Sequence, residues 1–363
     1  PPSPVLLELC DEMGFLVMDE AFDMWRKPKT QYDYSRFFDE WHARDIQDFI
    51  TRDRNHPSVI MWSIGNEIPE QYDAKEGNAD NMALAKQLSG LVRELDTTRA
   101  ITSGCNFVNP GNNILRSGAL DVYGFNYQPQ LYDSCRVWFP GKPLIGSETA
   151  SSLNSRGVYY QPSEVKRLPQ QWWQTYDSPD HQCTAYDVCS APWGNLHEEA
   201  WKPIRDRKWM AGTFIWTGFD YLGEPTPYGW PSRSSYFGIV DLAGFPKDVY
   251  WFYKSEWTED TVLHLFPHWN WTKGQQIDIW AYYNNADEVE LLVNGKSMGR
   301  KSKTRDVMHV IWPKVNFEPG KIEAVSYKNG KEVARDVRYT AGKAIALKLD
   351  TDRATIADDG YDL

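Results

Sequence analysis

SVIMWSIGNE, residues 58–67, is an apolar run that ends in an asparagine and a carboxylate, Asn66 and Glu67. The run is continuous rather than alternating, which is typical of a parallel strand covered on both faces. Similar runs recur along the chain at 14–18, 99–102, 121–125, 143–146 and 212–216. Amphipathic helical segments separate them, the clearest with Leu84, Leu88 and Val92 on one face. This alternation predicts an α/β fold, either a (β/α)8 barrel or an open doubly wound sheet.

The pattern changes after residue 257, where apolar and polar residues alternate as in strands with one buried face. The alternating segments lie at 276–282, 288–293 and 321–327. Asn294-Gly295 and Asn329-Gly330 are typical hairpin turns. We therefore predict an antiparallel β-sandwich after the α/β domain.

These patterns predict three parts. Residues 1–257 form an α/β domain, residues 258–341 a β-sandwich, and residues 342–363 the start of a further β domain. The last part opens with a run at 344–349 that we expect to form a strand. The chain begins abruptly with Pro1-Pro2-Ser3-Pro4, which leads directly into a helical segment. We interpret the chain as a fragment that continues at both ends.

Composition excludes several classes of protein. The formal net charge of −11 argues against nucleic acid as a partner, because phosphates require a basic face. No apolar run is long enough to cross a membrane. The 17 tryptophans and 20 tyrosines offer aromatic faces that suit sugar rings as well as a core. We expect the five cysteines to be buried free thiols, with a Cys183–Cys189 disulfide as the alternative.

Three of the predicted strands end in carboxylates. Asp19 and Glu20 follow one strand, Glu67 follows the next, and Glu148 follows the run at 143–146. In a barrel the carboxyl ends of all strands open on the face that holds the active site. Glycoside hydrolysis needs two carboxyl groups there, one to protonate the departing oxygen and one to attack the sugar or activate water. Sequence spacing alone leaves retention and inversion of configuration open.

The stretch DRNHPSVIMWSIGNE, residues 53–67, resembles the signature of family 2 glycoside hydrolases, which include β-galactosidases, β-glucuronidases and β-mannosidases. GFLVMDE at 14–20 is similar to the third barrel strand of the family, and FIW at 214–216 to the eighth. The resemblance implies a partial (β/α)8 barrel with strands three to eight, followed by an immunoglobulin-like β-sandwich. It also implies that sugar-binding domains and the first two barrel strands precede Pro1.

The resemblance assigns roles to individual residues. Glu67 matches the general acid/base and Glu148 the nucleophile of a retaining enzyme. Asn66 matches a ligand of the sugar 2-hydroxyl, Tyr127 a tyrosine that hydrogen-bonds the nucleophile, and Trp216 an aromatic platform for the sugar. Each has a structural alternative: Tyr127 and Trp216 as core aromatics, and Asn66 as a turn residue. For Asp19 and Glu20, substrate contact and a structural ion pair at the rim are both open.

Two departures from family patterns narrow the expected substrate and cofactor. Some family β-galactosidases bind Mg²⁺ through a Glu-x-His motif after the third strand. This chain has Asp23 and Trp25 at those positions, so we expect no metal in the active site. We expect no other cofactor either. Family β-glucuronidases carry Asn-x-Lys after the eighth strand; residues 219–229 have none, and Glu224 there would repel a uronate. We expect Glu224 to contact a neutral sugar.

We therefore expect a retaining exo-β-glycosidase, specifically a β-galactosidase. A β-glucuronidase of the same family and a non-catalytic carbohydrate-binding fragment are the alternatives. The expected partners are a carbohydrate and the preceding part of the same enzyme, with no nucleic acid and no membrane; the sequence leaves homo-oligomer formation open. From the resemblance to bacterial polysaccharide-degrading enzymes we expect a periplasmic or secreted protein.

Overall fold

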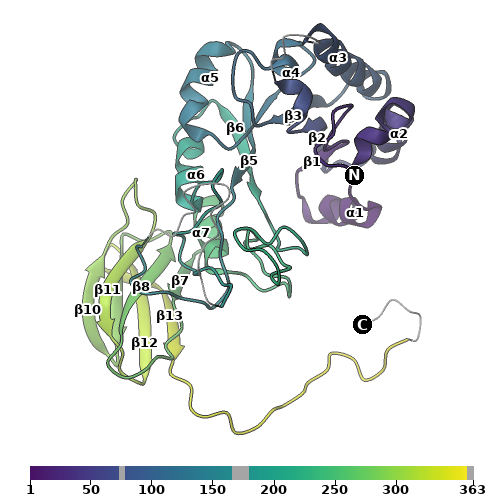
Figure 1. The fold of residues 1–363 in the computed structure, drawn as a ribbon. Helices are drawn as coiled ribbons and strands as arrows, with labels where there is room; N and C mark the ends of the chain where they lie inside the picture. Colours follow the sequence, from purple (N-terminus) through teal and green to yellow (C-terminus); the bar gives the residue numbers. More distant parts are fainter. Residues whose placement is uncertain (73–77, 166–179, 358–363) are drawn as a thin grey trace. The chain divides into compact units, whose positions relative to one another are not determined.

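A computed structural model describes residues 1–72, 78–165 and 180–357 (Figure 1). The chain divides into two compact units. The first consists of Pro1–Asp260 together with Thr304–Met308, and the second of Thr261–Lys303 together with His309–Leu363. The division lies close to the predicted boundary after residue 257. The short segment Thr304–Met308, which packs with the first unit, was not anticipated from the sequence.

Six parallel strands form the sheet of the first unit, and they follow one another in chain order. They are β1 (Val17–Glu20), β2 (Val59–Asn66), β3 (Ala100–Cys105), β4 (Tyr123–Asn126), β5 (Leu144–Ala150) and β6 (Met210–Trp216). A closed barrel of this kind has eight strands, so the sheet is part of a TIM barrel with free edges at β1 and β6. The prediction of a partial barrel is therefore confirmed.

Helices connect these strands, as Figure 1 shows. Those of the first unit are α1 (Pro4–Met13), α2 (Phe38–Asp53), α3 (Asn78–Leu95), α4 (Asn113–Arg116), α5 (Tyr132–Trp138), α6 (His197–Arg205) and α7 (Asp248–Trp257). Helix α1 begins where the sequence predicts: the Ser3 side chain caps the Leu6 amide, and Pro4 occupies the first turn. It ends at Gly14, whose φ of 76° is the left-handed conformation that glycine adopts readily.

The core lies between the sheet and these helices. Trp62 of β2 is fully buried and packs edge-on against Phe49 of α2, with ring centroids 5.2 Å apart. The Trp62 indole N–H donates to Asp96 at 2.9 Å, which satisfies the one polar atom that this large side chain brings into the core. Leu84 and Leu88 of α3 are also buried, as their helical spacing predicts. This packing fixes β2, the strand that ends in Asn66 and Glu67.

Seven antiparallel strands in two sheets make up the second unit among its described residues. They are β7 (Leu263–Phe266), β8 (Gln276–Tyr283), β9 (Glu288–Val293), β10 (Lys296–Lys301), β11 (Val310–Asn316), β12 (Lys321–Lys328) and β13 (Lys331–Tyr339). One sheet has the order β10-β9-β12-β13 and the other β11-β8-β7. Buried side chains of both sheets, such as Ile279, Leu291 and Trp312, form one core, as in a β-sandwich. Asn294-Gly295 and Asn329-Gly330 turn the β9–β10 and β12–β13 hairpins, as predicted.

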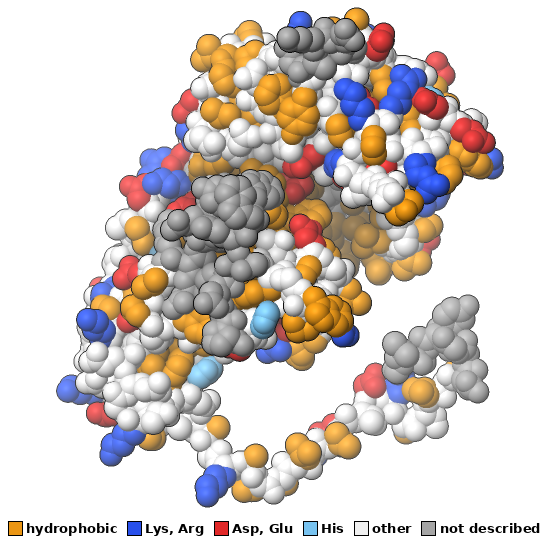
Figure 2. Space-filling view, viewed as in Figure 1, with side chains coloured by type: hydrophobic (Ala, Val, Ile, Leu, Met, Phe, Trp, Pro, Cys, Tyr) orange, Lys and Arg blue, Asp and Glu red, His pale blue; other side chains and the backbone are white. Residues whose placement is uncertain are grey.

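Two sequence predictions about the remaining segments need correction. No strand forms at 344–349: Ile345, Leu347 and Leu349 are more than 90% exposed, and Figure 2 shows hydrophobic side chains along this segment uncovered. An alternating pattern makes a strand only where it finds a partner edge. The alternative of a Cys183–Cys189 disulfide is also wrong, because both cysteines are buried free thiols. Within the described residues, none of the helices combines the length and apolar character needed to span a bilayer.

Candidate active site

A cavity of about 600 Å³ lies at the carboxyl ends of the barrel strands. It is lined by Asp23, Asn66, Glu67, Asn106, Asn126, Tyr127, Gln128, Glu148, Trp193, Trp216 and Glu224. Six of the eight residues singled out in the sequence thus line one cavity, although they come from four different strands and the loop after β6. These six are Asn66, Glu67, Tyr127, Glu148, Trp216 and Glu224.

Backbone geometry at the strand ends is unusual. Glu67 and Tyr127, directly after β2 and β4, have φ values of 46° and 58°. Side chains other than glycine adopt this left-handed region at a cost of about 1–3 kcal/mol. The neighbouring strands hold both residues there: the Glu67 amide donates to Gly104 O and the Tyr127 amide to Glu148 O, each at 2.7 Å. Such local strain is characteristic of functional sites.

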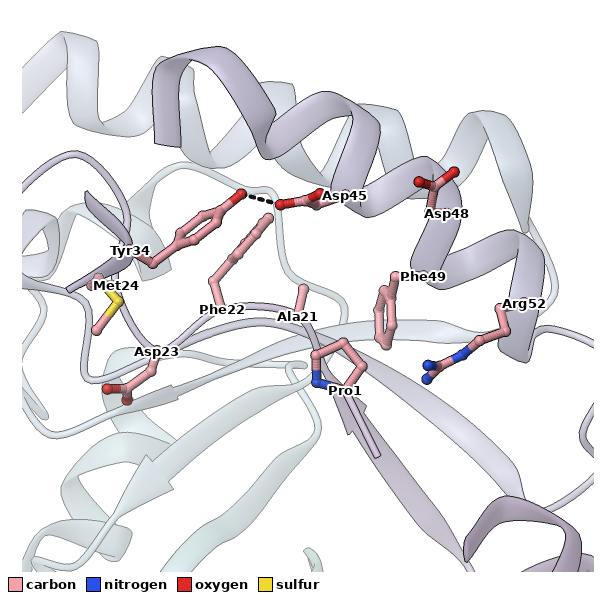
Figure 3. Close-up of a pocket in the computed structure, with 10 residues that line it drawn as sticks. All are labelled: Pro1, Ala21, Phe22, Asp23, Met24, Tyr34, Asp45, Asp48, Phe49 and Arg52. Carbon is pink, nitrogen blue, oxygen red and sulfur yellow. Dashed lines mark hydrogen bonds between the residues drawn. The ribbon is translucent and has the colours of Figure 1, made fainter. Parts of the chain in front are cut away.

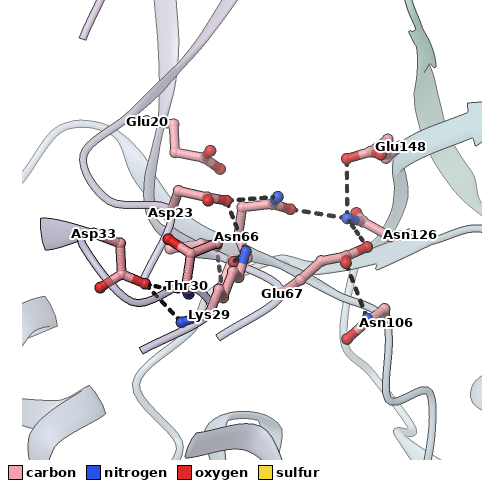
Figure 4. Close-up of polar contacts among 12 residues, drawn as sticks. Glu20, Asp23, Lys29, Thr30, Asp33, Asn66, Glu67, Asn106, Asn126 and Glu148 are labelled. Atoms are coloured by element: carbon pink, nitrogen blue, oxygen red, sulfur yellow. Dashed lines mark hydrogen bonds and ion pairs between the residues drawn. The ribbon is translucent and has the colours of Figure 1, made fainter. Parts of the chain in front are cut away.

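Asn126 links the two carboxylates of the cavity (Figure 4). Its Nδ2 lies 3.0 Å from Glu67 Oε1 and 3.1 Å from Glu148 Oε2, and it donates to Asn66 Oδ1 at 2.8 Å. The Ser147 hydroxyl donates to Asn126 Oδ1 at 2.7 Å, which leaves the nitrogen facing the carboxylates. Two oxygens this close to one nitrogen can be no more than about 6 Å apart.

Glu148 is surrounded by groups with opposite effects on its ionisation. Burial raises the pKa of Glu148 to about 8, and the negative charges of Glu67, Glu20 and Glu224 act in the same direction. The Tyr127 hydroxyl donates to Glu148 Oε1 and lowers the pKa. Burial and the nearby carboxylates therefore oppose ionisation of Glu148, whereas the hydrogen bond from Tyr127 favours its ionised form.

Glu67 has a second amide donor on its outer side. Asn106, which follows β3, donates from Nδ2 to Glu67 Oε2 at 3.0 Å. The orientation of the Asn106 amide is fixed because Gln71 and Tyr72 donate to its oxygen. Both oxygens of Glu67 thus face N–H donors, and the side chain is held in one position at the end of β2.

Aromatic side chains form another wall of the cavity. Trp216, at the end of β6, packs edge-on against Tyr221, with ring centroids 5.9 Å apart. The Tyr221 hydroxyl donates to Glu224, which lines the cavity. Trp193 adds a second indole from the loop before α6. A sugar ring has an apolar face and a rim of hydroxyl groups. Aromatic faces can pack against the apolar face, and a carboxylate such as Glu224 can accept hydrogen bonds from the hydroxyl groups.

Asp19 and Glu20 do not line the cavity. Consecutive strand residues point to opposite faces, so β1 directs Asp19 toward α2. Asp19 is 1% exposed, neither of its oxygens has a hydrogen-bond partner, and burial beside Asp53 raises its pKa. Substrate contact by Asp19 is therefore not supported by its position. Glu20 accepts from the Ser63 hydroxyl at 2.8 Å, and burial raises its pKa to about 7.

Replacing Glu20 by Gln is expected to stabilise the protein at pH 8 and not at pH 4. The folded-state pKa of about 7 lies above the ordinary value of 4.5, so the folded state holds a proton that the unfolded state releases, and stability falls as pH rises from 4.5 to 7. Glu20→Gln, which can still accept from Ser63, removes a penalty of about 3 kcal/mol at pH 8. Urea denaturation of wild type and variant at both pH values measures the difference in their free energies of unfolding. The exposed Glu12→Gln variant is the control; an equal gain there would contradict the assignment.

The site contains residues that the sequence prediction missed. Asn126 and Asn106 each end or follow a buried strand, so the rule that drew attention to carboxylates would have found them if extended to amides. Gln128 directly follows Tyr127. Trp193 gives no such signal, because it lies in a long connection between β5 and β6. Asp23 was noted only as a departure from a metal motif.

The residues after β1 do not fit the Mg²⁺ site of some family β-galactosidases. Trp25, in the position of the histidine, is fully buried, and its indole nitrogen donates to Ile64 O at 2.9 Å; an indole nitrogen cannot bind a metal, because its lone pair belongs to the aromatic ring. Asp23 Oδ1 already accepts from the Lys29 ammonium at 2.7 Å and from Asn66 Nδ2 at 3.2 Å. In the described ranges, His, Cys, Asp and Glu side chains form no group of three placed to hold a metal.

A second cavity, of about 480 Å³, lies beside β1 and α2 (Figure 3). Its walls are mostly apolar, with Phe22 and Phe49 among them, and its acids do not form a facing pair. Asp45 accepts from the Tyr34 hydroxyl, whereas Arg52 is held by Asp53 at 2.6 Å. The bridged carboxylates therefore place the candidate chemistry in the first cavity.

Gly104 permits the close approach of the two amides that order the carboxylates. A Cβ at this position would lie 2.8 Å from Asn66 Oδ1 and 2.9 Å from Asn126 Oδ1, well inside van der Waals contact. We expect Gly104→Ala to displace both amides. In an assay of glycoside hydrolysis, this displacement should lower kcat/KM by roughly 100-fold. The matched control is Gly90→Ala in α3, where a Cβ meets nothing within 4 Å and activity should be unchanged. Equal activity of the two variants would show that the amide positions are unimportant.

A parallel barrel with two carboxyl groups at its strand ends is an arrangement that glycoside hydrolases use. The chain belongs to glycoside hydrolase family 2: the family described as "Glycosyl hydrolases family 2, TIM barrel domain" matches residues 1–183. A second family, a domain of unknown function (DUF4982), matches residues 274–334 in the β-sandwich. The family predicted from the sequence is therefore confirmed.

Several known proteins are similar to the chain. β-Galactosidase BoGH2A of Bacteroides ovatus is 53% identical, with 100% of this chain and 46% of that protein aligned. A putative β-glucuronidase of Formosa agariphila is 36% identical, covering 95% of this chain and 34% of that protein. The crystal structure of a β-glycosidase from Bacteroides vulgatus superposes with a TM-score of 0.82 at 33% identity, covering 97% of this chain and 46% of that one. The chain thus spans about half the length, or less, of these relatives.

Proposed function

We propose that this chain carries the catalytic carboxylates of a retaining exo-β-galactosidase. The observation that supports this best is the Asn126 amide, which lies within hydrogen-bond distance of both Glu67 and Glu148. Carboxyl groups about 5–5.5 Å apart are typical of retaining glycosidases, whereas inverting enzymes need about 6.5–9.5 Å to admit a water molecule. A separation of at most about 6 Å between the facing oxygens favours the retaining arrangement.

Retention requires two displacements, and the two carboxylates divide the work. Glu148 attacks the anomeric carbon and forms a glycosyl ester while Glu67 protonates the departing oxygen. Glu67 then removes a proton from a water molecule that attacks the ester, and Glu148 leaves as a carboxylate. Hydrogen bonds from Tyr127 and Asn126 stabilise Glu148 in this ionised form.

The first displacement needs a proton on Glu67 and a negative charge on Glu148. Burial opposes ionisation of Glu148, whose pKa is raised to about 8. Positive charge develops on the sugar in the transition state, directly beside the nucleophile, and it favours the ionised form when it is needed. The like charge of Glu67 is removed at the same time if Glu67 carries the proton.

A neutral sugar suits the charge of the cavity better than a uronate. Asp23, Glu67, Glu148 and Glu224 line it, and none of its lining residues in the described part of the chain is Lys, Arg or His. A sugar carboxylate would enter a cavity lined by acidic side chains, with no basic side chain among the described lining residues to bind it. The 53% identity to a protein named as a β-galactosidase supports galactose. We propose exo action because the resemblance to family 2 exo-glycosidases implies it.

Turnover of p-nitrophenyl β-galactoside, β-glucuronide and β-mannoside tests the proposal, measured on the natural polypeptide that contains this chain. We expect the galactoside to be hydrolysed with the highest kcat/KM, and NMR of the first product to show the β-anomer. Preference for the glucuronide would overturn the sugar assignment and leave the chemistry intact. The α-anomer as first product would overturn retention.

A further inference from the structure

A buried chain of hydrogen bonds leads away from Glu148 on the side opposite Asn126. Tyr127 donates to Glu148, its oxygen lies 2.6 Å from Ser151 Oγ, and the Trp193 indole N–H donates to Ser151 Oγ at 3.3 Å. Tyr127 is 6% exposed and Ser151 fully buried. Neither Ser151 nor Trp193 has a role in the mechanism described so far.

The donor inventory of these groups sets the direction of the chain. An indole N–H can only donate, so Ser151 Oγ accepts from Trp193. A tyrosine has a single proton, and Tyr127 uses it on Glu148, so its oxygen accepts from the Ser151 hydroxyl. All three protons therefore point toward Glu148. Each acceptor bond on a hydroxyl strengthens its own donation, so the chain polarises Tyr127.

The backbone clamps Trp193 and Ser151 together. The Ala191 amide donates to Ser151 O at 3.0 Å and the Asn195 amide to Ala150 O at 2.7 Å, so the loop around Trp193 is bonded on both sides to the end of β5. Gly194 lets the two segments meet, because a Cβ there would lie 2.4 Å from Ala150 O and 2.8 Å from the Ser151 Cβ. This placement is built into the fold and does not depend on a flexible side chain.

We propose that Ser151 and Trp193 are positioning residues of the glycosidase site: they hold Tyr127 as a one-way hydrogen-bond donor to Glu148 and thereby stabilise the nucleophile in its ionised form. The proposal rests on the proposed function, since it assigns the nucleophile to Glu148. Burial and the neighbouring Glu148 raise the pKa of Tyr127 well above its usual value, so the phenol keeps the proton that it donates, while the hydrogen bonds from Ser151 and Trp193 act in the opposite direction.

Ser151→Ala and Trp193→Phe test the proposal: the first removes only the hydroxyl, and the second keeps an aromatic ring and removes the indole N–H. Alanine is compatible with the backbone there: Ala150, with φ of 71°, adopts the same left-handed conformation as Ser151 at 56°. We expect each variant to lower kcat/KM by roughly 10-fold and to move the acid limb of its pH profile upward by about half a unit to one unit, since the nucleophile then ionises less readily. Ser152→Ala is the matched control: Ser152 is equally buried, but its hydroxyl lies within hydrogen-bond distance of Asp187 and Cys189 O instead. It should leave the pH profile in place.

A double-mutant cycle shows whether the two residues act through Tyr127. In a Tyr127→Phe background, Ser151→Ala should have no further effect on the acid limb. Equal shifts in both backgrounds, or no shift in either, would overturn the proposal. ¹³C NMR titration of the Glu148 carboxyl in wild type and Ser151→Ala gives a readout that does not need turnover. A higher Glu148 pKa in the variant supports the proposed role of the hydrogen-bond chain, even if the sugar assignment fails. An unchanged Glu148 pKa refutes that role.

Discussion

Replacing Glu148 by Gly is expected to lower kcat on an aryl β-galactoside by roughly 10⁴-fold or more, because it removes the group that forms the covalent intermediate. The other parts of the site stay in place: Asn126 keeps its bonds to Asn66 and Glu67. Steady-state assays of purified wild type and variant measure the loss. A decrease of less than about 10-fold would rule out Glu148 as the nucleophile.

Azide gives this prediction a specific readout. The small anion fits the space left by the carboxylate and attacks the anomeric carbon from the same side, so Glu148→Gly should regain activity and form α-galactosyl azide. Glu224→Gln is the matched control, since it also removes one negative charge from the cavity lining but lies outside the bridged pair. Glu224→Gln should show no azide product. The β-azide from Glu148→Gly would contradict the assigned role.

Glu67→Ala is expected to have the second largest effect, and its size should depend on the leaving group. Loss of general acid/base catalysis typically costs about 10²–10⁴-fold. A galactoside whose leaving group needs no proton, such as 2,4-dinitrophenyl, should form the intermediate almost normally and then hydrolyse it slowly, since no base remains to activate water. Comparison of kcat/KM for phenyl and dinitrophenyl galactosides measures this difference.

Azide distinguishes the two carboxylates from each other. In Glu67→Ala it attacks the glycosyl ester on Glu148 without needing a base, so it should accelerate turnover and give β-galactosyl azide. The opposite products of the two variants assign the two roles independently of any sequence comparison. Equal loss on both leaving groups, without azide acceleration, would show that Glu67 is not the acid/base.

The sequence predicted the residues at the strand ends better than it predicted their orientation. A buried apolar run followed by a polar residue located Glu67 and Glu148, because parallel strands bring their carboxyl ends to one face. The same reasoning grouped Asp19 with them. However, the side chains of a strand alternate between its faces, and Asp19 lies beside Asp53 of α2 rather than in the cavity.

Contacts between distant segments lie beyond what a single sequence reveals. The Asn126 bridge depends on a register in which β4 and β5 bring Asn126 beside Glu148, and on the space that Gly104 leaves open in β3. Trp193 reaches Ser151 through a loop whose path no periodicity describes. Residues 344–349 have a pattern that is typical of a strand, but they form none, because a strand also needs a partner strand to pair with.

If Glu148 forms a covalent bond to the sugar, the glycosyl-enzyme intermediate can be trapped and located in the chain. A 2,4-dinitrophenyl 2-deoxy-2-fluoro-β-galactoside loads the nucleophile readily but slows its release, because fluorine destabilises the positive charge of both transition states. After incubation and proteolysis, mass spectrometry should find the fluorogalactosyl group on the peptide that contains Glu148, and no label in Glu148→Gln. A label on another residue, or hydrolysis of the parent galactoside with inversion and no label, would contradict the account.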